Sequence, residues 1–416
     1  MPTSAMPTSL ELCQRIENRG IAAWQHGEGL LDDLQASPGN GASRTPRTRS
    51  LLCVAKARDL LGVLPKAVVT ASHERRLTLA TQDGPIDLFP VPVDRLEEVL
   101  RSFGLSALAF AFRSARDSWC DPGKARSQFM AGHLDIAEDA TNPFAVAPHR
   151  YWLAARLLSQ YRLKPSAALL ESARTALPAV LERMPLGAPA RREVSRILAS
   201  SDPSLGLGFL RHAGVSAALF PGIHPAGESR ISALGEEPAL QWAAWLDGAA
   251  TQRAMAKLRM PHALARKIER IQRVHPLDRT IESLRDAAPR KGLKQLSQEE
   301  VAGLIRWRRL ELAAAVQNEE TSRRLKRLND IEARLDRLRL QRQHTSQVRT
   351  LAVDGKTVMR ELAAGPGPHV GRALSHLVDW IGRNPEKNQH AALILELQAW
   401  AKQRPLTTKS NTQKIE

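Results

Sequence analysis

The chain has 416 residues, of which 43% are hydrophobic, so it is long enough for several packed units and too apolar for a disordered polymer. Lys and Arg number 60 against 43 acidic residues, which gives a net charge of +17. Residues 251–350 hold 24 Lys and Arg residues and 12 acidic ones, so most of the excess lies in a quarter of the chain. Such a concentration favours a polyanionic partner, RNA or DNA ahead of an acidic membrane surface, over a merely solvated set of basic helices.

Cysteine usage and hydropathy indicate the compartment. Cys13, Cys53 and Cys120 are odd in number and lack the spacing of a metal site, which favours a reducing cytoplasm and argues against disulfides and structural zinc. The first residues lack a signal-peptide pattern, and no apolar run approaches the roughly 20 residues that span a bilayer. We therefore expect a cytoplasmic protein without a membrane partner.

The N-terminal third mixes helices and strands. After a polar lead over residues 1–8, the pattern predicts a helix from residue 10, a short strand at 21–24 and a second helix ending near 35. Residues 37–49 are rich in Pro, Gly, Ser and Thr and read as a loop. Short β-type runs follow at 51–55, 67–71, 77–80 and 86–91, with a hairpin turn at Asp83-Gly84.

From residue 96 onward the apolar period becomes helical, and strands do not clearly return. A break at 139–148 precedes amphipathic helices that continue to about residue 345. On a long Arg-rich helix we expect an apolar stripe that packs against a neighbouring helix rather than in a coiled-coil dimer, formed by Leu325, Leu328, Ile331, Leu335 and Leu338. The predicted fold class is α+β and predominantly helical, with a small mixed sheet at the N-terminus.

Two motifs near the C-terminus carry a family resemblance. Residues 351–359 read L-A-V-D-G-K-T-V-M, and residues 365–374 read G-P-G-P-H-V-G-R-A-L. They resemble L-P-V-x-G-x-D-L-M and P-G-P-x-I-G-x-x-L of the class II CCA-adding tRNA nucleotidyltransferases and bacterial poly(A) polymerases. Pro368 can start a helix whose free N–H groups face a phosphate, with charge nearby from Lys356, Arg360 and Arg372. A purely structural helix–turn–helix is the alternative.

The N-terminal part resembles the same family but departs from it at the residues that carry the chemistry. Residues 26–32, H-G-E-G-L-L-D, lie where the family has V-G-G-x-V-R-D, so Glu28 replaces a glycine, Leu31 replaces the arginine and Asp32 remains. The family's D-x-D is here Ser50-Leu51-Leu52, and no Asp-x-Asp occurs between residues 20 and 100. Asp87 matches the third family carboxylate.

The departures continue downstream. The family's R-R-D, which helps hold triphosphate, is replaced by Ser102-Phe103-Gly104, and its asparagine by Leu108. The motif E-D-x-x-R-x-x-R-x-x-R aligns with residues 146–156, where the Glu-Asp pair is absent and Leu153 replaces the middle arginine. Arg150 and Arg156 remain, either as residual phosphate or base contacts or as surface arginines.

Polymerase-type nucleotidyl transfer needs clustered carboxylates that hold two divalent ions. Only Asp87 and Asp32 stand at motif positions, so we predict no intact catalytic set, no metal site and no cofactor, with Mg²⁺ required if the chain were active. The resemblance implies a nucleotidyltransferase-like head over 1–135, a helical neck over 145–205 and a basic body over 206–345. A tail over 346–403 and a flexible end over 404–416 complete the predicted organisation.

Three functions compete. The first is binding of RNA, tRNA or another structured RNA, by the tail cations and by Arg323, Arg324, Lys326 and Arg327. The second is an active enzyme that adds CCA or A residues to RNA 3′ ends, with Asp32, Asp59 and Asp87 as metal ligands. The third is a scaffold that binds an acidic protein, a sister enzyme or a second copy of the chain. Four histidines are scattered without metal spacing and favour no metalloenzyme: His212, His224, His262 and His275.

Overall fold

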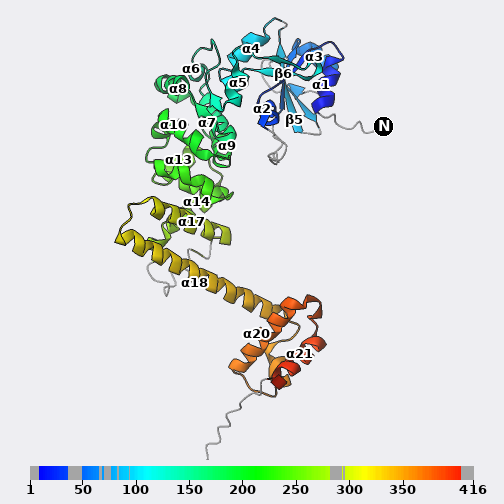
Figure 1. Ribbon diagram of the computed structural model, residues 1–416, viewed down its shortest axis with the longest axis vertical. Coiled ribbons are helices and arrows are strands. Elements are labelled where there is room, and N and C mark those ends of the chain that lie inside the picture. Colours follow the sequence, from blue (N-terminus) through cyan, green and yellow to red (C-terminus); the bar gives the residue numbers. More distant parts are fainter. Residues whose placement is uncertain are drawn as a thin grey trace, which may run out of the picture. The chain divides into compact units, whose positions relative to one another are not determined.

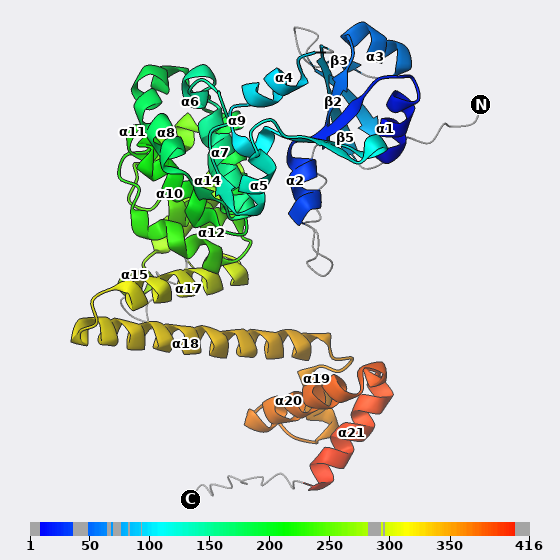
Figure 2. The same cartoon turned by 45° about the horizontal axis from the view of Figure 1, so that its top comes forward.

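The structure is a computed structural model that describes residues 9–35, 49–64, 68–69, 76–81, 84–92, 94–281, 293 and 296–403 (Figures 1 and 2). The polar lead, the loop over 37–48 and the end over 404–416 lie outside these residues. The chain divides into two compact units, the first reaching residue 280 and taking in the segment up to Glu311, the second containing Ile281 and everything from Leu312. The finer division into head, neck, body and tail stays a prediction.

The first unit opens with a mixed sheet, which in the described residues has seven strands in the order β3-β4-β5-β2-β1-β6-β7. Strands β2 and β5 are parallel, and every other neighbouring pair is antiparallel. The strands are β1 (Ala23–His26), β2 (Arg49–Val54), β3 (Val68–Val69), β4 (Leu77–Thr81), β5 (Gly84–Val91), β6 (Ala111–Arg113) and β7 (Ser118–Cys120).

Most of the predicted strands are confirmed, and one prediction is wrong. Thr81 pairs with Gly84, which confirms the hairpin, although Gln82 and Asp83 in its turn lie outside the described residues. Strands do return after residue 96, because β6 and β7 extend the sheet and β8 (His133–Leu134) pairs with β9 (Lys164–Pro165). These strands have only two or three residues, which is too short for an alternating pattern to show.

The two faces of the sheet are covered differently. Because side chains alternate along a strand, Leu51 and Cys53 face one side and Ser50 and Leu52 the other. The first side packs on α1 (Ser9–Glu17) and α3 (Ala57–Val63) in one apolar cluster. The other side packs on α4 (Leu96–Ser102) in a second cluster, and α2 (Glu28–Gln35) follows β1. The candidate site lies on this second face.

Apart from the short pair β8 and β9, the remainder of the first unit is helical. Helix α7 packs against α9 and α10, and α10 comes so close that a Cβ added to Gly206 would lie 2.1 Å from the carbonyl oxygen of Ala155. The helices are α5 (Ala125–Met130), α6 (Pro143–Val146), α7 (Arg150–Tyr161), α8 (Ala167–Val180), α9 (Ala188–Leu198), α10 (Pro203–His212), α11 (Val215–Leu219), α12 (Pro238–Trp245), α13 (Thr251–Lys257), α14 (His262–Val274), α15 (Leu277–Thr280) and α17 (Gln298–Ala314).

The second unit contains the long Arg-rich helix α18 (Glu319–Thr350) and three shorter helices, α19 (Gly355–Glu361), α20 (Pro368–Arg383) and α21 (His390–Gln403). Leu328 and Ile331 of the expected apolar stripe are buried, whereas Leu325 is 38% exposed. Helices α19, α20 and α21 share a core of their own. Among the described residues, no helix is long and apolar enough to span a membrane.

Candidate functional site

The register of β2 and β5 places the remnants of the carboxylate cluster side by side. Ser50 is paired with Asp87 in this parallel pair, and Leu52 lies two residues further along β2 on the same face. The three motif positions therefore do meet, as the resemblance predicts. Of the three side chains, only Asp87 carries a charge.

Asp87 is already neutralised by its own hairpin. The Thr78 hydroxyl donates a hydrogen bond of 2.7 Å to Oδ1 of Asp87, and Nε of Arg76 lies 3.2 Å from the same oxygen. The Asp87 residue is buried, and these two contacts pair its carboxylate within the protein. Serine and leucine in place of the other two carboxylates, together with this pairing, do not fit a site for two Mg²⁺ ions.

Leu52 and its neighbours fill the face that a substrate would need. Leu52, Leu100 and Ala111 are fully buried in the second apolar cluster. Phe103 follows α4 and stacks on His26, with ring centroids 4.3 Å apart. Burial lowers the pKa of His26 to about 4, so at neutral pH the imidazole is uncharged. The face is thus a packed core.

Polar contacts around Ser50 keep the glycine turn closed. The Ser50 hydroxyl donates to the carbonyl oxygen of His26 at 2.7 Å, and Nε2 of His26 lies 2.8 Å from the carbonyl oxygen of Leu108. Gly27 has a φ of +75°, and a Cβ there would lie 2.7 Å from the Ser50 hydroxyl. The cavity beside Ser50 has a volume of about 120 Å³, whereas pockets for drug-sized ligands reach roughly 300–1,000 Å³.

Arg150 contacts the segment Ser102-Phe103-Gly104, which stands in place of the family's R-R-D motif. The guanidinium of Arg150 donates to the carbonyl oxygen of Ser102 at 2.7 Å and to that of Pro143 at 3.1 Å. Gly104 has a φ of +78°, and a Cβ at this position would lie 2.8 Å from Nη1 of Arg150. The absence of a side chain at Gly104 therefore leaves space for Arg150. The guanidinium of Arg150 joins the segments that contain Ser102 and Pro143.

Arg156 is the centre of a buried ion-pair cluster. Its guanidinium donates to both carboxylate oxygens of Glu28, at 2.5 and 2.7 Å, and to Oε2 of Glu193 at 2.5 Å. Burial opposes the charge of Arg156, but the hydrogen bonds and charges of the two carboxylates outweigh it and raise the pKa of Arg156. Arg156 is therefore not a surface arginine. The carboxylate of Glu28, at the start of α2, binds the cation that a phosphate would otherwise meet.

Asp32 takes part in the same contact between α2 and α7. The hydroxyl of Tyr161 donates to Oδ1 of Asp32 at 2.8 Å and lies 3.2 Å from the carbonyl oxygen of Glu28. Asp59 lies on α3, where Nε of Arg58 is 3.6 Å from its carboxylate. Within the described residues, Asp32, Asp59 and Asp87 do not gather into a group that could hold a metal ion, so the alternative ligand set does not form.

The predicted RNA-binding residues of the second unit are mostly exposed. On α18, Arg323 and Arg324 pair with Glu319 and Glu320 one turn earlier, and Arg327 donates to the carbonyl oxygen of Ile281. Lys326, Lys356 and Arg372 are exposed, and so are Arg323 and Arg360, although Nε of Arg360 lies 3.6 Å from the carboxylate of Glu361. Pro368 is the first residue of α20, as predicted, and the His369 ring contacts the carbonyl oxygen of Gly365 at 2.8 Å.

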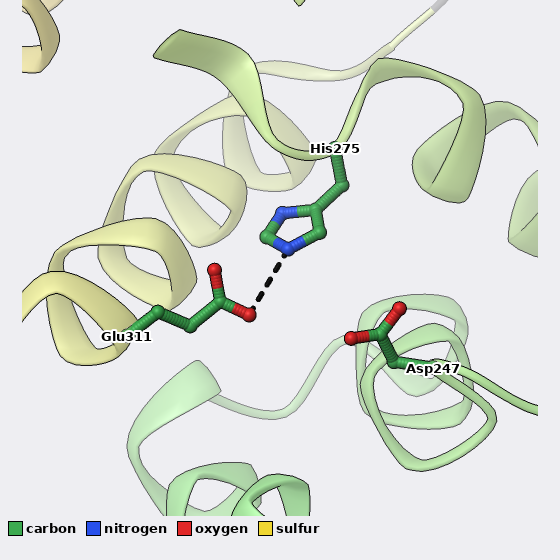
Figure 3. A group of neighbouring side chains, drawn as sticks. All are labelled: Asp247, His275 and Glu311. Atoms are coloured by element: carbon green, nitrogen blue, oxygen red, sulfur yellow. Dashed lines mark hydrogen bonds and ion pairs between the residues drawn. The ribbon is translucent and has the colours of Figure 1, made fainter. Parts of the chain in front are cut away.

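Sequence reasoning missed one cluster of ionisable groups. Asp247, His275 and Glu311 come from three separate segments of the first unit, and their ligand-type atoms lie within 4.8 Å of one another (Figure 3). No spacing rule links residues so far apart in the chain, so only the fold reveals the group. It lies apart from the sheet face described above.

Comparisons with known proteins agree with the architecture. No model of a protein family and no curated protein matches the chain. Among solved structures, the Bacillus stearothermophilus CCA-adding enzyme in complex with CTP is 17% identical and covers 95% of this chain and 97% of its own, with a TM-score of 0.59.

Two further structures show the same likeness. The Thermotoga maritima CCA-adding enzyme complexed with tRNA is 14% identical and covers 94% of this chain and 93% of its own, with a TM-score of 0.56. A structure of a tRNA-processing enzyme complex is also 14% identical, with coverages of 78% and 98% and a TM-score of 0.55. At this identity the likeness concerns the fold, and the chain has the fold of the CCA-adding enzymes, as its motifs predict.

Proposed function

We propose that the protein binds RNA, tRNA or another structured RNA, on a tRNA nucleotidyltransferase-like scaffold without adding nucleotides. The observation that carries the non-catalytic part of this proposal is the ion-pair cluster of Arg156 with Glu28 and Glu193. An enzyme that binds a nucleoside triphosphate must offer cations to its phosphates. Here a motif arginine is buried and bound by two carboxylates of the protein itself.

Catalysis would require several of these contacts to break together. Glu28 would have to leave Arg156, Phe103 would have to leave His26, and a triphosphate with its metal ions would have to replace them. The negative charge of Glu28 repels phosphate at the start of α2, where a helix N-terminus otherwise attracts an anion. Removing one contact alone would leave the others in place. These features support loss of nucleotide addition.

RNA binding is supported by the charges that remain exposed. Lys326, Lys356, Arg360 and Arg372 stand on the helices of the second unit, and contacts of this kind to phosphates give binding that is strong, salt-dependent and little selective for sequence. The Thermotoga maritima enzyme of the same fold was solved with tRNA bound. A basic surface on a fold that binds tRNA elsewhere favours RNA over an acidic protein as the partner.

The binding test measures affinity for tRNA at a series of salt concentrations, with fluorescence anisotropy as the readout of binding. We expect the logarithm of the affinity to fall linearly with the logarithm of the salt concentration. A variant with Lys326, Lys356, Arg360 and Arg372 replaced by Glu should bind at least about tenfold more weakly, with a salt slope lower by roughly 3–4. The matched control has the same change of net charge on exposed arginines of the first unit, with Glu at Arg15, Arg19, Arg58 and Arg116.

Equal losses in the two variants would show that overall charge, and not this surface, governs binding. Catalysis is tested separately with radiolabelled ATP or CTP, tRNA lacking its 3′ end, and Mg²⁺ or Mn²⁺. We expect no label in the RNA at protein concentrations that saturate binding. Incorporation above that of a buffer control would contradict the non-catalytic part of the proposal and leave RNA binding standing.

A further inference from the structure

The cluster of Asp247, His275 and Glu311 has the chemistry of a metal site. Asp247 follows α12, His275 follows α14, and Glu311 lies on α17, so the three side chains join three helical segments (Figure 3). Nε2 of His275 lies 3.1 Å from Oε1 of Glu311, close to the roughly 3.4 Å that separates two ligands of a tetrahedral zinc ion. The Asp247 carboxylate lies within 4.8 Å of these two ligand atoms, so it would have to move closer to complete a tetrahedral set.

The surroundings hold two of the three ligands in place. The His275 ring is 7% exposed and stacks on Trp307, with centroids 3.7 Å apart and planes inclined by 11°. Oε2 of Glu311 accepts a hydrogen bond of 2.9 Å from Arg308, which Asp278 binds in turn through two hydrogen bonds of 2.5 and 2.9 Å. Hydrogen-bonded outer partners of this kind orient ligating carboxylates in metal sites.

The charges leave room for a divalent cation. Asp247 has no Lys or Arg within ion-pair distance among the described residues, although it faces a second carboxylate. Burial first, and then the charge of Glu311, raise the pKa of Asp247, while His275 acts in the opposite direction. Arg230 lies 3.7 Å from Oε1 of Glu311 and is the cation that a metal would have to displace or tolerate.

We propose that Asp247, His275 and Glu311 bind one zinc-type divalent transition-metal ion, which clasps the ends of α12 and α14 to α17. One imidazole and two carboxylates form a mixed nitrogen and oxygen ligand set that suits zinc, with water in the fourth position. The ion ties together segments distant in sequence and keeps one exchangeable position, as open zinc sites do. This site does not rest on the proposed RNA-binding function and takes no part in the closed sheet face.

The test uses the full chain, stripped with a chelator and titrated with Zn²⁺ in competition with a coloured zinc indicator. We expect one ion per chain at high affinity, and a melting temperature raised by roughly 5 °C when Zn²⁺ is present at about a hundred times its Kd. Co²⁺ added in place of Zn²⁺ should give visible absorption bands of a low-coordinate site. Mg²⁺ at the same concentration should give neither effect.

Matched variants assign the ligands. Asp247→Asn and His275→Gln should each weaken Zn²⁺ binding by at least about tenfold, whereas His262→Gln, an exposed histidine of α14, should bind like the parent. Asp247 is only half buried, so Asp247→Asn remains informative if His275→Gln does not fold, as judged by near-UV circular dichroism. Absence of stoichiometric Zn²⁺ binding, or equal affinity in Asp247→Asn and His262→Gln, would show that Arg308 and Arg230 alone balance the cluster.

Discussion

The sheet face of the first unit and the motif turn of the second unit differ in where their charged motif residues lie. On the sheet face, the surviving motif groups are bound by the protein, Arg156 by Glu28, Arg150 by Ser102 and Asp87 by Arg76. In the second unit, Lys356 and Arg372 extend from exposed positions on α19 and α20. The polar groups of one region are internal, and those of the other face solvent.

This difference follows from what each region needs in order to fold. A sheet face that loses its ligands must be covered, because a buried charge without a partner is costly. A helix surface needs no cover, and its cations are stable in water without any partner. The sheet face is therefore packed as a core, while the helices of the second unit present exposed cations.

The largest expected effect comes from removing Arg156, the central cation of the ion-pair cluster in the first unit. Arg156→Ala leaves the carboxylates of Glu28 and Glu193 facing each other in a partly buried site, and removing one partner of a buried ion pair typically costs about 3–5 kcal/mol. We expect a loss of this order in the free energy of unfolding, measured by urea denaturation. Arg192→Ala, an exposed residue of the same bundle, should change it by less than about 0.5 kcal/mol. Equal small effects would show that the cluster does not hold α2 to α7.

A second prediction concerns acid. The pKa of His26 is about 4 in the folded protein against an ordinary value of 6.5. As the pH falls below about 6.5, the unfolded chain binds a proton that folded His26 cannot, so stability decreases until about pH 4. The loss attributable to this residue amounts to about 3 kcal/mol.

The matched variant for this effect is His26→Gln, which keeps an N–H group within reach of Leu108 but does not titrate. Unfolding free energies of parent and variant should converge as the pH is lowered from 7 to 4. Parallel pH profiles would show that His26 is accessible to protons, and hence that the sheet face is open.

The smallest expected effect concerns the exposed cations of the second unit. Lys356→Ala removes an exposed charge on α19 and should leave the melting temperature unchanged. If Lys356 contacts one phosphate, affinity for tRNA at 0.15 M salt should fall by about fourfold to fivefold, and the salt slope by about 1. Arg150→Ala should behave oppositely, lowering the melting temperature without changing RNA affinity. A fall in RNA affinity for Arg150→Ala would place RNA on the first unit.

The sequence was informative where a motif depends on neighbouring residues. Local patterns predicted the hairpin with its turn at Asp83-Gly84 and the helix start at Pro368. The structure confirms both. Strands β6 and β7 are too short to show a period and were missed. Pairing between distant residues was also invisible, since nothing in the spacing of Glu28 and Arg156 marks them as partners.

The sequence showed that the carboxylates of the family motif are absent, but it did not show which contacts occupy those positions. Phe103 and Gly104 read only as departures from a motif, whereas in the structure one stacks on His26 and the other admits Arg150. A residue that departs from a family pattern can be seen in the sequence, but the residue that it contacts is determined by the fold. The cluster at Asp247 was out of reach for the same reason.

The complete burial of Leu52 bears on whether a carboxylate could be introduced at this position of β2. Leu52→Asp would place a carboxylate inside an apolar cluster before any metal ion could bind it, and Glu28→Gly would leave the buried Arg156 with fewer anions around it. Each single substitution toward the family motif is therefore expected to lower the stability of the fold. A metal site designed on this face would therefore need changes at Leu52, Ser50 and Glu28 made together, since each alone meets a packed or ion-paired neighbour.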